Sequence, residues 1–76
     1  MENLSEIRTG DRVKIVAIPG SCPLRIPLQQ FGITPGSKLF CRYCSPGSEL
    51  AALECEGTVL ALRLSELSKI TVVPCL

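Results

Sequence analysis

The most constraining feature of this chain is a series of short segments in which apolar and polar residues alternate, separated by glycine- and proline-rich turns. Alternation with a period of two is typical of β-strands that have one buried face. Glu56-Gly57 predicts a two-residue hairpin turn, because glycine accepts the positive φ that such a turn requires. We expect Ser45-Pro46-Gly47-Ser48 to form the tip of another hairpin. The predicted strands are residues 12–18, 38–44, 50–55, 58–64 and 70–73.

Seventy-six residues are enough for one domain only, so we expect a single domain over residues 1–76. Five short strands with tight connections favour an all-β fold, a small SH3-like five-stranded barrel that is closed or nearly closed. Closure would remove the exposed edges of a sheet this small. A chain of this length has little spare stability for a deep substrate cleft, which argues against an enzyme.

One segment has a helical period. Leu24, Leu28 and Phe31 are spaced as i, i+4 and i+7, which predicts a short helix with this stripe packed on the barrel. The helix would be inserted between the first and second strands. Pro27 is compatible with it only in the first turn, where its missing N–H is not needed.

The ends of this helix also have sequence signals. We expect Ser21 to cap the N-terminus. Gly32 is expected to end the helix in the left-handed conformation, with Ile33 folding back as a hydrophobic contact. Residues 34–37, Thr-Pro-Gly-Ser, then predict a type II turn.

Charge and aromatic content argue against several kinds of partner. Eight Lys and Arg against seven Asp and Glu give a net charge of +1, and these residues are scattered along the sequence. The basic stripe of a nucleic-acid-binding domain is therefore not predicted. One tyrosine and two phenylalanines are too few for base stacking, or for the groove with which SH3 domains bind proline-rich peptides.

The N-terminal residues 1–6 are polar and acidic, unlike a signal peptide. The longest apolar runs are far shorter than a membrane span. We therefore expect a cytoplasmic protein that does not insert into a membrane, with its thiols reduced. A monomer is the default expectation.

The five cysteines, an odd number with irregular spacing, argue against a disulfide framework and favour buried apolar roles. Cys41 and Cys44 form a C-x2-C pair, the candidate metal ligands, but strand alternation would direct them to opposite faces. A transient Fe2+ or Zn2+ site that adds carboxylates such as Glu54 and Glu56 stays open. The chain has no histidine to activate a cysteine and no phosphate-binding loop, so we predict no catalytic residue.

Several motifs together resemble one family. Leu4-Ser5, Gly10-Asp11, Leu28-x-x-Phe31-Gly32-Ile33-x-Pro35-Gly36 and Ala61-Leu62-Arg63 follow one another as in the FeoA family, and the resemblance extends to about Val73. It implies a small SH3-like barrel that assists bacterial ferrous iron uptake without catalysis. Its implied partner is the cytosolic GTP-binding portion of the ferrous iron permease FeoB. The chain departs from the family at Pro27, where members usually carry a basic residue.

The predicted helix is the candidate partner-binding surface. Arg25 is its one positive charge, and Gln29 and Gln30 lie on the face opposite the apolar stripe. These residues, together with Leu28 from the family block, are the candidate site. Two other hypotheses stay open at this stage: a cysteine-based module that binds or senses a transition metal ion, and a purely structural barrel within a larger assembly.

Overall fold

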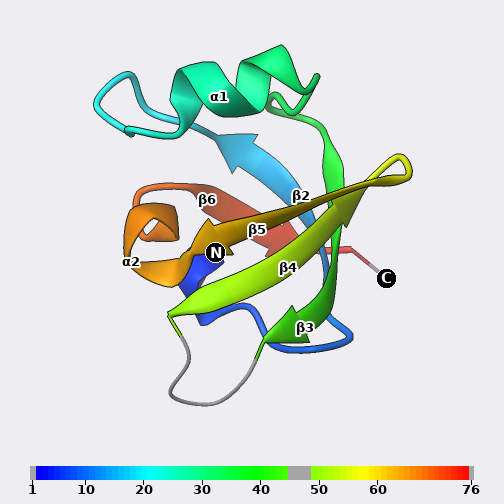
Figure 1. Cartoon of the computed structure of the whole chain (residues 1–76). Helices are drawn as coiled ribbons and strands as arrows, with labels where there is room; N and C mark the ends of the chain where they lie inside the picture. The colour runs from blue at the N-terminus through cyan, green and yellow to red at the C-terminus, as the bar shows by residue number, and fades with distance from the viewer. Residues whose placement is uncertain (1, 45–48, 76) are drawn as a thin grey trace.

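Six antiparallel strands form one strongly curved sheet in the computed structural model, which describes residues 2–44 and 49–75 (Figure 1). The order of the strands in the sheet is β1-β6-β2-β3-β4-β5. The predicted all-β architecture is confirmed, and a two-residue strand at one edge is added to it. The expected hairpin tip at residues 45–48 lies outside the described residues. The strands are β1 (Glu2–Asn3), β2 (Arg12–Ala17), β3 (Lys38–Cys44), β4 (Leu50–Cys55), β5 (Thr58–Arg63) and β6 (Thr71–Pro74).

The hydrophobic core fills the inside of this curved sheet, because alternate residues of each strand point inward. In β4, for example, Ala51, Leu53 and Cys55 are buried while the residues between them are not. The core contains no buried polar or charged side chain among the described residues. Its largest fully buried members are Leu4, Ile15, Leu67, Ile70, Val72 and Cys41.

Three short helices complete the fold: the 3-10 helix η1 (Leu4–Glu6), α1 (Arg25–Gln30) and α2 (Leu64–Leu67). The helices η1 and α2 contact each other and bury Leu4 and Leu67. Helix α1 connects β2 to β3 and lies across one end of the barrel (Figure 1). The prediction of a helix inserted at this point is confirmed.

The C-terminus of α1 has the predicted geometry. Gly32 has a φ of 78°. Its N–H donates to the Gln29 carbonyl at 3.0 Å, and the Ile33 N–H donates to the Leu28 carbonyl at 2.9 Å. These two bonds define a Schellman motif, in which the residue after the glycine returns to the core. Ile33 is accordingly buried.

Two expectations for α1 were wrong. The helix begins at Arg25, and its N-cap, Leu24, makes no side-chain capping bond, so Ser21 lies outside the helix. Phe31 is 56% exposed rather than packed on the barrel. It is the C-cap residue, with a ψ of 7°, so the helical spacing ends one position before it. Ile33 takes the place in the core that the stripe had suggested for Phe31.

Tight turns fix the hairpins as the sequence indicates. The β4–β5 turn has positive φ at both Glu56 (49°) and Gly57 (85°), the combination of a type I′ turn. In the turn before β3, Gly36 has a φ of 97° and the Ser37 N–H donates to the Thr34 carbonyl at 2.9 Å. This agrees with the predicted type II turn.

Two irregularities break the expected alternation. The pairing of β2 with β6 shifts between Ile15 and Ala17, so Ala17 is exposed instead of lying beside Val13 and Ile15 in the core. The pairing of β3 with β4 shifts between Cys41 and Tyr43. Each bulge adds one residue to one strand. The side chains that follow the bulge in that strand therefore point to the opposite face of the sheet from the one that regular alternation predicts.

The barrel is of the nearly closed kind. The two ends of the sheet are β1 and β5, and no pairing between them is present in the described part of the chain. The helix α2 contacts β5, and η1 contacts α2, beside this gap. Because β1 and β5 do not pair within the described residues, β5 keeps a free edge that a fully closed barrel would not have.

Candidate functional site

The outer face of α1 exposes most of the predicted site. Arg25, Gln29 and Gln30 are all exposed. Leu28 is not: its side chain is 2% exposed and belongs to the core, because it follows Leu24 by one helical turn on the inner face. The inclusion of Leu28 in a surface that touches a partner is therefore corrected, and its role is to hold the helix on the barrel.

A pocket lies beside the Arg25 and Gln29 side of α1, with a volume of about 170 Å3. Its lining combines apolar side chains from just after β2 and from the loop after α1 with polar and charged side chains. This is the chemistry of a site that accepts one apolar side chain and orients it by polar contacts. The lining residues are Ile18, Arg25, Gln29, Ile33, Thr34 and Pro35.

The guanidinium of Arg25 lies beside the backbone of Gly20. A Cβ at Gly20 would lie 3.3 Å from Nη1 of Arg25, so the guanidinium rests against the bare backbone there. Within the described residues no carboxylate lies within ion-pair distance of Arg25. The guanidinium is thus available to an acidic group supplied from outside the chain.

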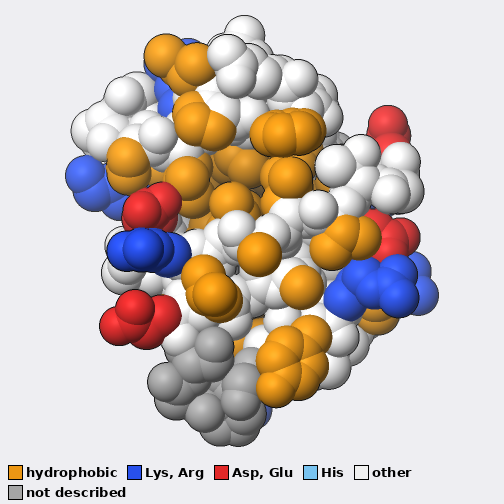
Figure 2. All heavy atoms as spheres, in the orientation of Figure 1, with side chains coloured by type: hydrophobic (Ala, Val, Ile, Leu, Met, Phe, Trp, Pro, Cys, Tyr) orange, Lys and Arg blue, Asp and Glu red, His pale blue; other side chains and the backbone are white. Residues whose placement is uncertain are grey.

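The same helix also presents apolar groups. Ile26 is 67% exposed and Phe31 56% exposed. A helix turns about 100° per residue, which places Ile26 between Gln29 and Gln30 around α1. Figure 2 shows hydrophobic side chains gathered on the visible face between α1 and the strands below it, where the surface is hollowed. Helix α1 and its C-cap therefore expose polar and apolar side chains together.

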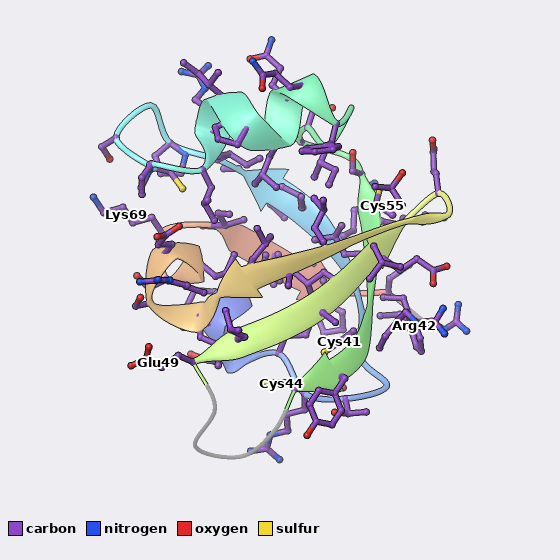
Figure 3. All side chains as sticks on the ribbon, in the orientation of Figure 1. Cys41, Arg42, Cys44, Glu49, Cys55 and Lys69 are labelled. Atoms are coloured by element: carbon purple, nitrogen blue, oxygen red, sulfur yellow. The ribbon has the colours of Figure 1, made fainter. Side chains whose placement is uncertain are left out.

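The C-x2-C pair lies differently from the expectation. The bulge between Cys41 and Tyr43 leaves Arg42 and Tyr43 both exposed and returns Cys44 to the core side. Cys41 is completely buried, and Cys44 packs partly buried against the core (Figure 3). The prediction that alternation separates the two thiols was wrong, because it assumed a regular strand.

Burial favours the neutral form of two thiols, Cys41 and Cys55, because it raises the pKa of each. Desolvation raises the pKa of Cys41 above its ordinary value, and the nearby Cys44 raises it further, against a smaller lowering by a backbone hydrogen bond at Tyr43. Burial, and then the charge of Glu56, raise the pKa of Cys55. Metal ligation requires the thiolate. Among residues 2–44 and 49–75, no group of three or more His, Cys, Asp or Glu side chains is placed to hold a metal ion.

The part of the site that the sequence did not indicate is the wall of the pocket opposite α1. Ile18, Thr34 and Pro35 come from segments before and after the helix and meet only in the folded chain. The one available signal was the Gly32 helix end, which predicts that the loop after it turns back. Separately, no helix within the described residues has the length and hydropathy needed to cross a bilayer.

Comparisons with known proteins agree with this architecture. The FeoA domain model matches residues 2–74. An FeoA-like protein from Clostridium acetobutylicum is similar with a TM-score of 0.84 and 28% identity, over 99% of this chain and 87% of that one. The FeoA protein from Chlorobium tepidum is similar with a TM-score of 0.80 and 30% identity, over 92% and 67% of the two chains.

A third structure is more distant in sequence. The zinc complex of FeoA from Stenotrophomonas maltophilia, described as a procaryotic SH3 domain protein, has a TM-score of 0.78 and 21% identity, over 96% of this chain and 91% of that one. At this identity the likeness bears on the fold alone, and it confirms the SH3-like type. No curated protein sequence matches the chain.

Proposed function

This chain belongs to the FeoA domain family, and from that premise we propose that it is a non-enzymatic accessory of bacterial ferrous iron uptake. Its proposed partner is the cytosolic GTP-binding portion of the permease FeoB, and its proposed location is the cytoplasm. The observation that carries the proposal is an exposed surface on α1, formed by Arg25, Gln29 and Gln30, beside a pocket in a family member that lacks a catalytic set.

The side chains support a function in binding a partner and not in catalysing a reaction. The chain contains no histidine, and the raised pKa values of Cys41 and Cys55 keep these thiols in their unreactive form at neutral pH. A helix that exposes apolar side chains beside polar ones is instead suited to docking against another protein.

Arg25 gives this surface its charge. Arg25 is the one basic residue of the helix, two residues before Pro27, where the family resemblance would lead one to expect a basic residue. We propose that the partner supplies a carboxylate to Arg25 and an apolar side chain to the adjoining pocket. An Arg–carboxylate pair at the rim of an interface contributes mainly to orientation and association rate.

The test is a binding titration of the full chain with the purified cytosolic domain of the ferrous iron permease from the same organism. It is run without nucleotide, with GDP and with a GTP analogue, at low salt. We expect saturable binding in at least one nucleotide state. Arg25→Glu should weaken it at least about tenfold, because it places like charges opposite each other.

The matched control is Arg63→Glu, the same charge reversal at another exposed residue. It should leave the affinity within about twofold, since charges remote from an interface are screened. Absence of binding in every nucleotide state would contradict the proposed partner. Equal losses in both variants would move the site away from α1.

The cysteine-based alternative has its own measurement. Native mass spectrometry of the chain after exposure to Zn2+ or Fe2+, with and without Cys41→Ser and Cys44→Ser, reports retained metal directly. Because the burial of Cys41 opposes its ionisation, we expect no metal to survive desalting. Retention that both substitutions abolish would favour the metal-binding alternative over the docking function.

A further inference from the structure

The outer face of β2 and β3 gathers half of the positive charge of the chain. Arg12 and Lys14 on β2, and Lys38 and Arg42 on β3, are four of the eight basic residues, and all four are exposed. In the sequence they are separated by α1 and its loops, so no stripe is visible there. We call these four residues the basic face. Figure 3 shows Arg42 pointing away from the barrel, on the side opposite Lys69 and Glu49.

The register of the two strands places like charges together. Lys14 lies directly opposite Lys38. The Ile15 N–H donates to the Ser37 carbonyl at 2.9 Å, so Ile15 faces β3 and its neighbour Lys14 directs its backbone toward β6. The two lysines therefore form a non-hydrogen-bonded pair, the closer of the two antiparallel geometries. Like charges directly opposite in a sheet are destabilising.

The described carboxylates do not neutralise this pair. Glu54 forms an ion pair with Arg42 at 2.5 Å. The Asp11 carboxylate accepts a hydrogen bond from the backbone N–H of Arg8 at 2.9 Å. The guanidinium of Arg12 lies over the Phe40 ring at 4.9 Å, which holds it at the surface. Among the described residues, Arg12, Lys14 and Lys38 have no ion-pair partner, so these exposed cations are available to an external anionic surface.

The shape of the surface indicates what that complement is. A peptide binds along an open sheet edge or in a groove. Both β2 and β3 are interior strands, paired on each side, so neither offers a free edge to an added peptide strand. A sheet face that carries several cations, with no free edge, fits an extended negatively charged surface. We propose that the basic face contacts the anionic lipid headgroups of a membrane.

This contact is peripheral and weak by itself. Each Lys or Arg near an anionic bilayer raises the partition coefficient about fivefold, and three unpaired cations together raise it about a hundredfold. Such a contact goes beyond the proposed docking on FeoB. It would orient an accessory that is already bound to a membrane protein, because tethering converts weak binding into an intramolecular event.

The test uses the full chain and lipid vesicles without any permease. Sedimentation is compared for vesicles of phosphatidylcholine alone and for vesicles containing about 30% phosphatidylglycerol, at about 20 mM and 300 mM salt. We expect binding only to the anionic vesicles, and its loss at the higher salt concentration. The double variant Lys14→Glu with Lys38→Glu should reduce the partition coefficient at least about tenfold.

The matched control is Arg63→Glu with Lys69→Glu, which changes the net charge equally at exposed positions outside the basic face. It should keep at least about half of the binding. No binding to anionic vesicles at low salt, or equal losses in both double variants, would overturn the proposal. Because no permease is present, failure of the docking proposal leaves this result unaffected.

Discussion

Cys22, Cys41 and Cys55 lie in the core at 4%, 0% and 9% exposure, among Leu, Ile and Val side chains. A free buried cysteine behaves as a small apolar group, which suits a narrow barrel. Composition alone indicated this role. The structure adds that burial raises the pKa of Cys41 and of Cys55, and this makes the role measurable through pH.

We predict that the free energy of unfolding falls as the pH rises above 9. Both thiols have an ordinary pKa of 9.0 that is raised in the folded state. Below that pH both states are neutral, so the stability is fully present. Above it the unfolded chain loses these protons while the folded chain keeps them, and the stability is lost until the folded pKa is passed.

Urea denaturation between pH 7 and pH 10.5 measures this effect. A double variant, Cys41→Ala with Cys55→Ala, is less stable throughout but should show a shallower decline with pH. A decline equally steep in this variant would assign the alkaline sensitivity to other groups.

The burial of Leu28 leads to a second residue-scale prediction. Leu28→Ala should lower the free energy of unfolding by about 2 to 5 kcal/mol, because it leaves a cavity under α1. Ile26→Ala, on the exposed side of the same helix, should change it by at most about 0.5 kcal/mol. Thermal or urea unfolding of the two variants makes the comparison. Similar effects would mean that Leu28 does not anchor the helix.

At the scale of the elements, the two ends of α1 show what local sequence does and does not encode. The C-terminus was predictable because Gly32 has a conformational property of its own: a left-handed φ without strain. The N-terminus was not, because Leu24 begins the helix without any capping bond and is held instead by its burial in the core. Tertiary packing there replaces the local signal that Ser21 had suggested.

We predict that Gly32→Ala lowers the free energy of unfolding by about 1 to 2 kcal/mol. An added Cβ at Gly32 meets nothing within 4 Å, so the cost is the positive φ alone. Gly20→Ala is the control, because its Cβ would meet only the mobile tip of Arg25 and no positive φ is involved. Equal stabilities of the two variants in urea denaturation would contradict the left-handed helix end.

The two bulges lay beyond sequence reasoning for a different reason. Each bulge is a shift in pairing between strands, at residues 15–17 and 41–43, and the extra residue is set by how the neighbouring strands align. Because of the second bulge, Cys44 lies on the same side of the sheet as Cys41, whereas regular alternation had predicted opposite sides.

At the scale of the whole molecule, β5 is one edge of the sheet. The register of its pairing with β4 decides which of its backbone N–H and C=O groups point toward β4 and which point toward the free edge. Cys55 and Thr58 close the two-residue turn as a hydrogen-bonded pair. Alternation then directs Leu60 and Leu62 toward β4, and Val59 and Ala61 toward the free edge. The outward groups of Val59 and Ala61 have no partner within residues 2–44 and 49–75.

We predict that the amide protons of Val59 and Ala61 exchange with solvent at least about tenfold faster than those of Leu60 and Leu62. Hydrogen exchange followed by NMR measures each amide. The amides of Val13 and Lys14, in an interior strand, serve as controls and should both be protected. Equal protection along β5 would show that another strand covers this edge.

The sequence by itself determined the fold class, the place of the helix, the turns and the family, because each depends on local conformational preference or on an ordered set of motifs. Only the tertiary structure decided that Phe31 is exposed and that Cys41 and Cys44 share a side. It also decided that Lys14 meets Lys38 and that Ile18 joins Pro35 around one pocket. These features depend on register between distant segments, and register is set by the packing of the whole barrel.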